Sequence, residues 1–395
     1  MSAAVQSLTG KPDIDQAALD LVRDRLAGLG RQYTPVDVAS AMRDEGLIVS
    51  DSAVLDTVES LRRNSVGAGP LESLLHEPGV TDVLVNGPEQ VFVDRGSGLE
   101  LTDLRFPCEG DVRRLAQRLA ASVGRRLDDA VPFVDARLAD GSRVHAVLGT
   151  LASPGTCISL RVPAQRSFSL DDCVASGSLT LGAAQLLSRM IEARLAFLIS
   201  GGTGSGKTTL LAALLALVPP HERIVIVEDS RELAPNHPHV VRIEGRPANT
   251  ELAGAISLTD LVRQSLRMRP DRLVVGEVRG AEICDLLTAM NTGHEGGCGT
   301  VHANSTADVP ARLEALASLG GLPRPALHAQ LASALDAVIH VIRDRSGMRR
   351  VAEVSILLRD PESGLVRSEC AVDFGSDGST VLGPGSRQLE RMLEK

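Results

Sequence analysis

The amino-acid sequence predicts an α/β protein in which a short helical bundle and a smaller α+β domain precede the main domain. From residue 195 onward, continuous apolar strands alternate with helical segments, which indicates a sheet that is partly parallel and covered on both faces. Between residues 71 and 162 the apolar residues recur with a period near two, as expected for β-strands. Before residue 65 they recur at helical spacing.

Residues 1–66 are expected to form the helical bundle. Thr34 is a suitable N-cap, and Pro35 stands at the first position of the helix that follows it. Residues 65–70 include Gly67 and Gly69 and are interpreted as a linker. The predicted helices cover residues 16–29, 35–45 and 53–63.

Residues 70–165 are expected to form the α+β domain. The dipeptides Asn86-Gly87 and Asp140-Gly141 favour tight turns between its strands. The predicted strands cover residues 80–85, 90–93, 132–138 and 143–148, and the predicted helix covers residues 111–123.

Residues 166–358 are expected to form the main domain, and residues 359–395 a C-terminal extension of strands. A hairpin-like turn is predicted at residues 344–348. The predicted strands of the main domain cover residues 195–200, 224–227, 273–275 and 300–302. Its predicted helices cover residues 208–217, 256–268, 282–291 and 307–318.

The composition excludes several classes of protein. The 395 residues carry a formal charge of −9 and include 6 Phe, 1 Tyr and no Trp, so direct nucleic-acid binding is not expected. The six cysteines form no C-x-x-C pair, and we expect no structural zinc. The longest apolar run, residues 210–218, is shorter than the roughly 18 residues that span a bilayer, and no signal peptide is recognised. These features predict a cytoplasmic protein.

A phosphate-binding loop is the strongest motif in the chain. The segment from Gly201 to Thr208 fits G-x-x-x-x-G-K-[ST] and lies between an apolar strand and a helix. Lys207 is one of only three lysines, and the other two, Lys11 and Lys395, lie near the termini. The motif predicts binding of ATP with Mg²⁺, with Lys207 on the β- and γ-phosphates and the Thr208 hydroxyl on the metal. The expected nucleotide-binding residues are Gly201, Gly202, Thr203, Gly204, Ser205, Gly206, Lys207, Thr208 and Thr209.

Acidic residues follow two of the predicted strands. Glu228 and Asp229 end the strand at 224–227, and Glu277 follows the strand at 273–275. In folds of this class an additional strand usually separates the P-loop strand from the strand that carries the catalytic acid, so we expect Glu277 to polarise the attacking water. Glu228 and Asp229 are expected to hold Mg²⁺ through its waters, and the expected metal ligands are Thr208, Glu228 and Glu277. A helix cap or a surface turn is the alternative role for Glu228 and Asp229.

Two histidines, His294 and His302, flank a glycine-rich segment and a short strand. A loop of this kind could sense phosphate, so both are candidate catalytic residues. The alternative is that each is a hydrogen-bonded structural histidine.

The four segments GGTGSGKTT, IVIVEDSREL, RPDRLVVGEVRG and GHEGGCGTVHANS occur in this order. They resemble the Walker A motif, Asp box, atypical Walker B motif and His box of the secretion-type traffic ATPases of type II and type IV secretion. The upstream segments TDVLVNGPEQVFVDRGSGLE, DARLADGSRVHAVLGTL and ISLRV resemble the tight-adherence pilus branch, CpaF/TadA. The resemblance extends over about residues 70 to 355.

The resemblance implies a RecA-like P-loop ATPase core preceded by an α+β, PAS-like domain. It also implies a homo-hexameric ring that powers assembly or retraction of a pilus, or secretion, at an inner-membrane platform protein on the cytoplasmic face. Arg143 and Arg161 lie in the similar segments and are expected to reach the γ-phosphate when the domains close. Exposed ion pairs are the alternative for both, and Arg267 and Arg269 are then the next candidates.

Two other functions stay open. A RecA-like motor acting on nucleic acid, or a conjugative DNA-transfer ATPase, would share the same core, but no aromatic residue accompanies its basic cluster of Arg263, Arg267, Arg269, Arg272 and Arg279. A nucleotide-binding regulatory protein with little turnover is the other alternative, and measurable ATP hydrolysis would distinguish it.

Overall fold

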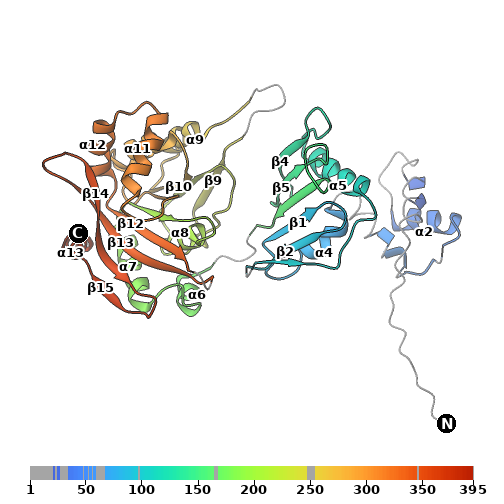
Figure 1. Cartoon of the computed structure of the whole chain (residues 1–395), viewed down its shortest axis with the longest axis horizontal. Helices are drawn as coiled ribbons and strands as arrows, with labels where there is room; N and C mark the ends of the chain where they lie inside the picture. The colour runs from blue at the N-terminus through green and yellow to red at the C-terminus, as the bar shows by residue number, and fades with distance from the viewer. Residues whose placement is uncertain are drawn as a thin grey trace, which may run out of the picture. The chain divides into compact units, whose positions relative to one another are not determined.

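A computed structural model describes residues 21–22, 25–26, 34–47, 49–51, 53–55, 57–58, 67–96, 98–163, 168–246, 254–344 and 347–394. The chain divides into two compact units, residues 1–163 and 164–395 (Figure 1). Each unit has its own sheet and its own buried core.

The described part of residues 1–66 contains α2 (Pro35–Asp44), which confirms the predicted helix 35–45. Thr34 accepts a hydrogen bond from the backbone of Asp37, and the Asp37 carboxylate accepts one from the backbone of Thr34. This reciprocal cap fixes where the helix begins. The predicted helices 16–29 and 53–63 fall only partly within the described residues. The buried apolar residues here are Val22, Leu26, Val38, Ala41, Met42 and Val54.

A six-stranded sheet in the order β3-β2-β1-β6-β5-β4 forms the rest of the first unit, and all its neighbours are antiparallel. Helix α5 (Glu109–Ser122) packs its apolar residues into the same core as alternate residues of β1, such as Val83 and Val85. This is the predicted α+β arrangement. The strands are β1 (Asp82–Asn86), β2 (Val91–Asp94), β3 (Leu99–Leu101), β4 (Phe133–Arg137), β5 (Arg143–Val147) and β6 (Cys157–Arg161), with short helices η1 (Gly69–Leu71) and α4 (Glu72–Leu75).

A nine-stranded sheet in the order β15-β14-β13-β12-β7-β11-β10-β8-β9 organises the second unit. The strands from β12 to β9 are parallel, and β13, β14 and β15 add an antiparallel edge. The strands are β7 (Phe197–Gly201), β8 (Ile224–Glu228), β9 (Val240–Glu244), β10 (Arg272–Val278), β11 (Cys298–Val301), β12 (Ala337–Arg343), β13 (Arg349–Arg359), β14 (Val366–Phe374) and β15 (Thr380–Leu382). The predicted α/β class with a partly parallel sheet is confirmed.

The expected boundary between residues 358 and 359 falls inside β13. The segment after it pairs with β13 along β14, so the C-terminal strands belong to the main sheet and do not form a separate extension. The sequence also gave no prediction for β9 or for α7 (Leu181–Glu192) and α12 (Arg324–Ala334).

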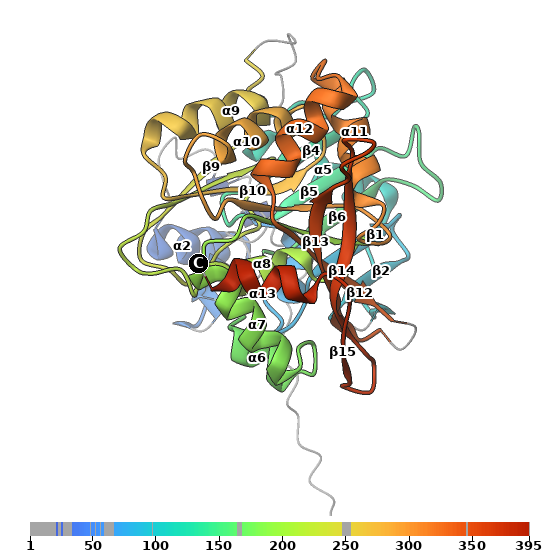
Figure 2. The same ribbon diagram turned by 90° about the vertical axis from the view of Figure 1, so that its left-hand side faces the viewer.

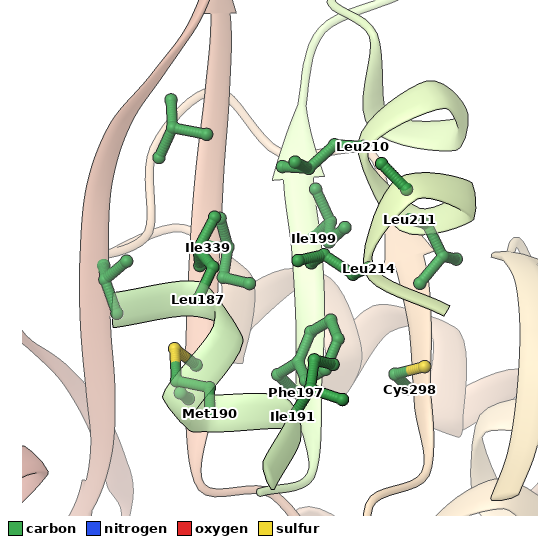
Figure 3. Packing of buried hydrophobic residues seen from close by; sticks show 14 of the residues in the cluster. Leu187, Met190, Ile191, Phe197, Ile199, Leu210, Leu211, Leu214, Cys298 and Ile339 are labelled. Carbon is green, nitrogen blue, oxygen red and sulfur yellow. The ribbon is translucent and has the colours of Figure 1, made fainter. Parts of the chain in front are cut away.

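Helices cover both faces of this sheet (Figure 2). One core combines α6, α7, α8 and α13 with Phe197 and Ile199 of β7. The other core combines α9, α10, α11 and α12 with Leu198, the residue between those two on the same strand. Figure 3 shows part of the first core, in which Leu187 of α7 lies beside Ile339 of β12, and Leu214 of α8 lies beside Ile199 of β7. The remaining helices are α6 (Leu170–Ala175), α8 (Lys207–Leu215), α9 (Leu258–Ser265), η2 (Leu266–Met268), α10 (Glu282–Met290), α11 (Val309–Leu319) and α13 (Ser386–Leu393). None of the helices in the described part of the chain is both long and apolar enough to cross a bilayer.

Candidate nucleotide-binding site

The P-loop joins β7 to α8, as the motif requires. Gly201 has a φ of 154°, and a Cβ there would lie 2.2 Å from the Val341 carbonyl oxygen. Gly206 has a φ of 96° and precedes the first residue of α8. These two positions need glycine because the loop must turn tightly beside β12 before the helix begins. A Cβ on Gly202 would meet nothing within 4 Å, so the loop is open at this residue.

Lys207 is a buried cation at the base of this loop. Its Nζ donates to the carbonyl oxygens of Gly201 at 3.0 Å and Gly202 at 2.8 Å, and the residue is 6% exposed. Burial lowers the pKa of Lys207, while the nearby Glu277 charge acts in the opposite direction. A buried ammonium that faces mainly carbonyl oxygens gains energy when a polyanion enters the loop.

Glu277 lies at the carboxyl end of β10 and contacts two polar side chains. Its Oε2 accepts a hydrogen bond from Arg279 at 2.5 Å, and its Oε1 lies 2.8 Å from Nε2 of His302. Burial would raise the pKa of Glu277, but the hydrogen bond and charge of Arg279, together with the Lys207 charge, outweigh it, so the pKa is lowered. Burial and the Lys207 charge lower the pKa of His302, so the ring favours its neutral form. The site therefore holds an ionised carboxylate beside a neutral imidazole.

Strand register explains why these residues meet. Strand β11 lies between β7 and β10, and Val301 pairs with Ser200 on one side and with Val278 on the other. The register of β10 shifts between Val275 and Val278, a bulge that includes Glu277 and that typically re-aims a side chain. The intervening strand expected from the sequence is thus β11, and His302 directly follows it.

Glu228 is the last residue of β8 and is buried. Its Oε1 accepts backbone hydrogen bonds from Glu232 at 2.9 Å and Leu233 at 2.8 Å, and the residue is 4% exposed. A Cβ on residue 276 would lie only 2.6 Å from the Cγ of Glu228, which is too close for a side chain other than that of glycine. Burial raises the pKa of Glu228 against the effect of its backbone hydrogen bonds. Gly276 therefore makes room for Glu228, which caps the turn after β8, whereas Asp229 is 51% exposed and lies 3.9 Å from Arg279.

The two histidines lie at opposite ends of β11. His302 follows the carboxyl end, next to the P-loop, but His294 precedes the amino end, and its Nδ1 lies 3.2 Å from the Ala289 carbonyl of α10. The glycines near His294 serve packing, because a Cβ on Gly296 would meet Arg272 and one on Gly297 would meet Met290. The structure therefore does not bring His294 to the nucleotide site.

Arg143 and Arg161 lie in the first unit and are direct partners across β5 and β6. Arg137 pairs with Arg143 on the other side, so three arginines form one row across the sheet. Arg161 contacts Asp82 at 3.2 Å and remains 59% exposed. Arg272 of the predicted basic cluster is different: it is 1% exposed and pairs with Glu222, so it belongs to the core and offers no surface charge.

The structure adds Arg349, which sequence reasoning missed. Its Nε donates to the Gly204 carbonyl of the P-loop at 2.9 Å, and its Cδ lies 3.4 Å from the Cβ position of Gly206. Arg349 begins β13, opposite Arg343 of β12. No local motif marks this residue, because it reaches the loop through a hairpin more than a hundred residues away.

These residues fit a nucleotide with its metal ion. The Thr208 hydroxyl at the start of α8, the exposed Asp229 and Glu277 supply oxygen donors, and the P-loop supplies the phosphate cradle. Within the described ranges, no cluster of three or more His, Cys, Asp or Glu side chains could hold a metal by itself. Mg²⁺ does not need one, because it is usually bound by one or two carboxylates, waters and the phosphates of the substrate.

Known proteins are similar to this chain over most of its length. The family model "Type II/IV secretion system protein" matches residues 64–370. The "Putative conjugal transfer protein MT3759" of Mycobacterium tuberculosis (strain CDC 1551 / Oshkosh) is 55% identical over 316 residues, which cover 78% of this chain and 90% of that protein. The "Type IV secretion system protein PtlH" of Bordetella pertussis (strain Tohama I / ATCC BAA-589 / NCTC 13251) is 33% identical over 317 residues, covering 72% and 92%.

Among solved structures, the pilus retraction motor PilT with bound ADP is similar with a TM-score of 0.53 and 20% identity, over 74% of this chain and 83% of that one. This likeness supports the fold, a RecA-like core with an N-terminal domain. The family match covers most of the chain, and the P-loop, Glu277 and His302 lie within it. The chain belongs to the type II/IV secretion system protein family and is an ATPase.

Proposed function

We propose that this ATPase is a hexameric motor that converts ATP hydrolysis into movement at a membrane platform. The observation that supports it best is the convergence of Lys207, Glu277, His302 and Arg279 beside one P-loop. A site that only binds nucleotide needs the lysine and the loop, but it does not need an ionised carboxylate held between an arginine and a histidine.

In this proposal Glu277 accepts a hydrogen bond from the attacking water and aligns it with the γ-phosphate. Its lowered pKa keeps it ionised at neutral pH, and His302 fixes the orientation of its Oε1. Thr208 and Asp229 would hold Mg²⁺, which neutralises phosphate charge when bound. Lys207 neutralises charge on the β- and γ-phosphates.

Arg143 and Arg161 are proposed to complete the site when the first unit closes on the second. A planar guanidinium can contact two γ-phosphate oxygens, whereas an ammonium cannot reproduce that geometry. Arg143→Lys and Arg161→Lys should therefore each lower kcat by at least about 10-fold with little change in ATP affinity. Arg105→Lys, an exposed arginine that contacts only backbone carbonyls of its own loop, is the control. Near-normal kcat for both site variants would move this role to Arg267 and Arg269.

The ring is tested by measuring mass. Mass photometry of the full chain with a non-hydrolysable ATP analogue and Mg²⁺ should show hexamers, because a motor of this type works through relative motion of its subunits. A strict monomer at micromolar concentration that hydrolyses ATP at the full rate would overturn the ring mechanism.

We infer that the motor drives a pilus, on the cytoplasmic face of the membrane, from the similarity of the upstream segments to the tight-adherence branch. A second candidate is conjugal transfer or type IV secretion, which the names of the 55% and 33% identical relatives favour. Inactivation of the chain by Lys207→Ala in its own cell separates the two. Loss of surface filaments with normal DNA transfer and secretion supports the pilus, and the reverse result supports the second candidate.

A further inference from the structure

A polar cluster of four buried residues and one half-buried glutamate lies next to the nucleotide site, and no step of the proposed chemistry uses it. It consists of Ser200, His340, Glu353, Ser355 and Thr306, and it is called here the interstrand cluster. His340 of β12 pairs in register with Ser200 of β7, and its Nδ1 lies 2.9 Å from the Ser200 hydroxyl. Ser200 is the residue immediately before Gly201, so this hydrogen bond reaches the entrance of the P-loop.

The second contact of His340 reaches the other half of the site. Burial lowers the pKa of His340, and the backbone of Asn304, two residues after His302, acts in the opposite direction, so this backbone lies beside the ring. His340 is 6% exposed, and Ser200 is fully buried, so solvent does not compete for the hydrogen bond between them. A single imidazole thus connects the strand that enters the P-loop with the segment that follows His302.

Glu353 provides a second contact to the segment that follows His302. Thr306 donates to Glu353 Oε1 at 2.9 Å, and the Ser355 hydroxyl bonds the same oxygen. Glu353 is also the register partner of His340 on β13. The segment 302–306 is therefore anchored to β12 and β13 by side chains, in addition to its continuation from β11.

The chemistry of a neutral imidazole suits this position. It has one donor and one acceptor nitrogen, which can serve one hydroxyl and one backbone group at the same time. Burial lowers the pKa of His340, which favours this neutral form. An apolar residue of similar size would leave the Ser200 hydroxyl and the Asn304 backbone group without this partner.

We propose that His340 is a positioning residue: it sets the distance between the P-loop strand and the segment after His302, so that His302 stays against Glu277. The proposal rests on the catalytic role proposed above for Glu277 and His302. His340 itself does not contact Glu277 or the P-loop lysine in this role, and it acts only through His302.

The first test is His340→Leu in the full chain. Because a displacement of about 1 Å in a catalytic group can cost up to 10²-fold, we expect kcat to fall by at least about 10-fold while KM and the affinity for an ATP analogue change little. His340→Gln, which keeps a donor and an acceptor, should recover part of kcat. Ser200→Ala should lower kcat less, and it serves as the second variant if His340→Leu does not fold.

The matched control is His328→Leu. His328 is also a buried histidine with two hydrogen bonds, to Glu314 at 2.8 Å and to the backbone of Val366 at 2.8 Å, but it lies in α12. It should lower the melting temperature and leave kcat of the folded protein near normal. Equal losses of kcat for the two leucine variants would overturn the proposal, since both would then reflect destabilisation alone.

The second test asks whether His340 acts through His302. In the His302→Ala background, His340→Leu should have little further effect on kcat, whereas two independent residues would give additive losses. Additive losses would overturn the proposal. If instead His302→Ala and Glu277→Gln both keep wild-type turnover, the proposed catalytic assignment fails first. If both are inactive while His340→Leu is normal, only the positioning role fails.

Discussion

An arginine paired with a glutamate lies at each end of β10, and the two pairs differ in burial and in their other contacts. At the amino end, Arg272 is 1% exposed, contacts Glu222 at 2.7 Å and also donates to the Ile191 carbonyl. At the carboxyl end, Arg279 is 57% exposed and lies between Glu277 and the exposed Asp229. The first pair is enclosed by the core, and the second faces the nucleotide loop.

The two pairs differ in how far their contacts could change when a nucleotide binds. At the amino end, Arg272 also donates to the Ile191 carbonyl of α7, and Glu222 also accepts from Arg194. These contacts hold both side chains of the pair in one arrangement. The pair at the carboxyl end lies beside His302 and Lys207, so an incoming phosphate can change which partners each group takes. Of the two pairs, the one at the carboxyl end is therefore the one that a nucleotide could reach.

The largest effect is expected at the carboxyl end. Lys207→Ala removes the cation of the P-loop and should lower ATP hydrolysis by roughly 10²- to 10³-fold, with a large loss of ATP affinity. Its effect on stability should be small, because the folded protein no longer buries a charge. Isothermal titration with an ATP analogue, steady-state hydrolysis and thermal unfolding check these points. Normal ATP affinity in the variant would remove Lys207 from the site.

The amino end should respond in the opposite way. Arg272→Met leaves Glu222 buried without its closest partner, which costs roughly 3–5 kcal/mol for a broken buried pair. We expect the lower value, because Arg194 still contacts Glu222 at 3.1 Å. Urea unfolding measures this loss, and turnover per folded molecule should stay near normal.

The matched variant is Arg279→Met at the other end of the same strand. It should lower stability by less than about 1 kcal/mol, because solvent screens a pair that is half-exposed, yet it should lower turnover. If Arg279→Met destabilises more than Arg272→Met, the contrast between the two ends is wrong.

The smallest effect is expected for Glu228, whose carboxylate caps a turn. Burial raises its pKa above the ordinary value of 4.5, so the folded state favours the protonated form. The stability that this group contributes is therefore present at low pH and is lost as the pH rises from 4.5 through the folded pKa. Glu228→Gln keeps the acceptor oxygen, so it should flatten this pH dependence and retain most of the turnover. Thermal unfolding at a series of pH values measures the first effect, and an unchanged pH profile would contradict it.

Much of the site could be predicted from sequence because its parts are local. The P-loop follows from the spacing of Gly201, Gly206 and Lys207, and Glu277 follows from its place after an apolar strand. Most core helices and parallel strands follow from their hydrophobic patterns, but α7 and α12 were not predicted, and β9 was missed because all five of its residues are only half-buried.

The rest depends on contacts between distant segments. The inward turn of Glu228 requires the space that Gly276 leaves on β10, and the placement of His294 requires the direction of β11 within a parallel sheet. Arg349 and His340 reach the site from β13 and β12, so no spacing near the P-loop could reveal them. The boundary predicted after residue 358 falls inside β13, which pairs with β12 on one edge and with β14 on the other. These pairings also join distant segments.

In the proposed function, Glu277 activates the attacking water and Lys207 binds the phosphates, so substitutions should separate the two roles. The most direct measurement compares Glu277→Gln with the unmodified chain for ATP-analogue affinity and steady-state hydrolysis under the same conditions. Glutamine keeps the shape but not the charge, so affinity should stay within a few-fold while hydrolysis falls by roughly 10²- to 10⁴-fold. Hydrolysis at the wild-type rate in Glu277→Gln, together with an inactive Glu228→Gln, would contradict the account and assign the reaction to the carboxylate that the structure places in the turn after β8.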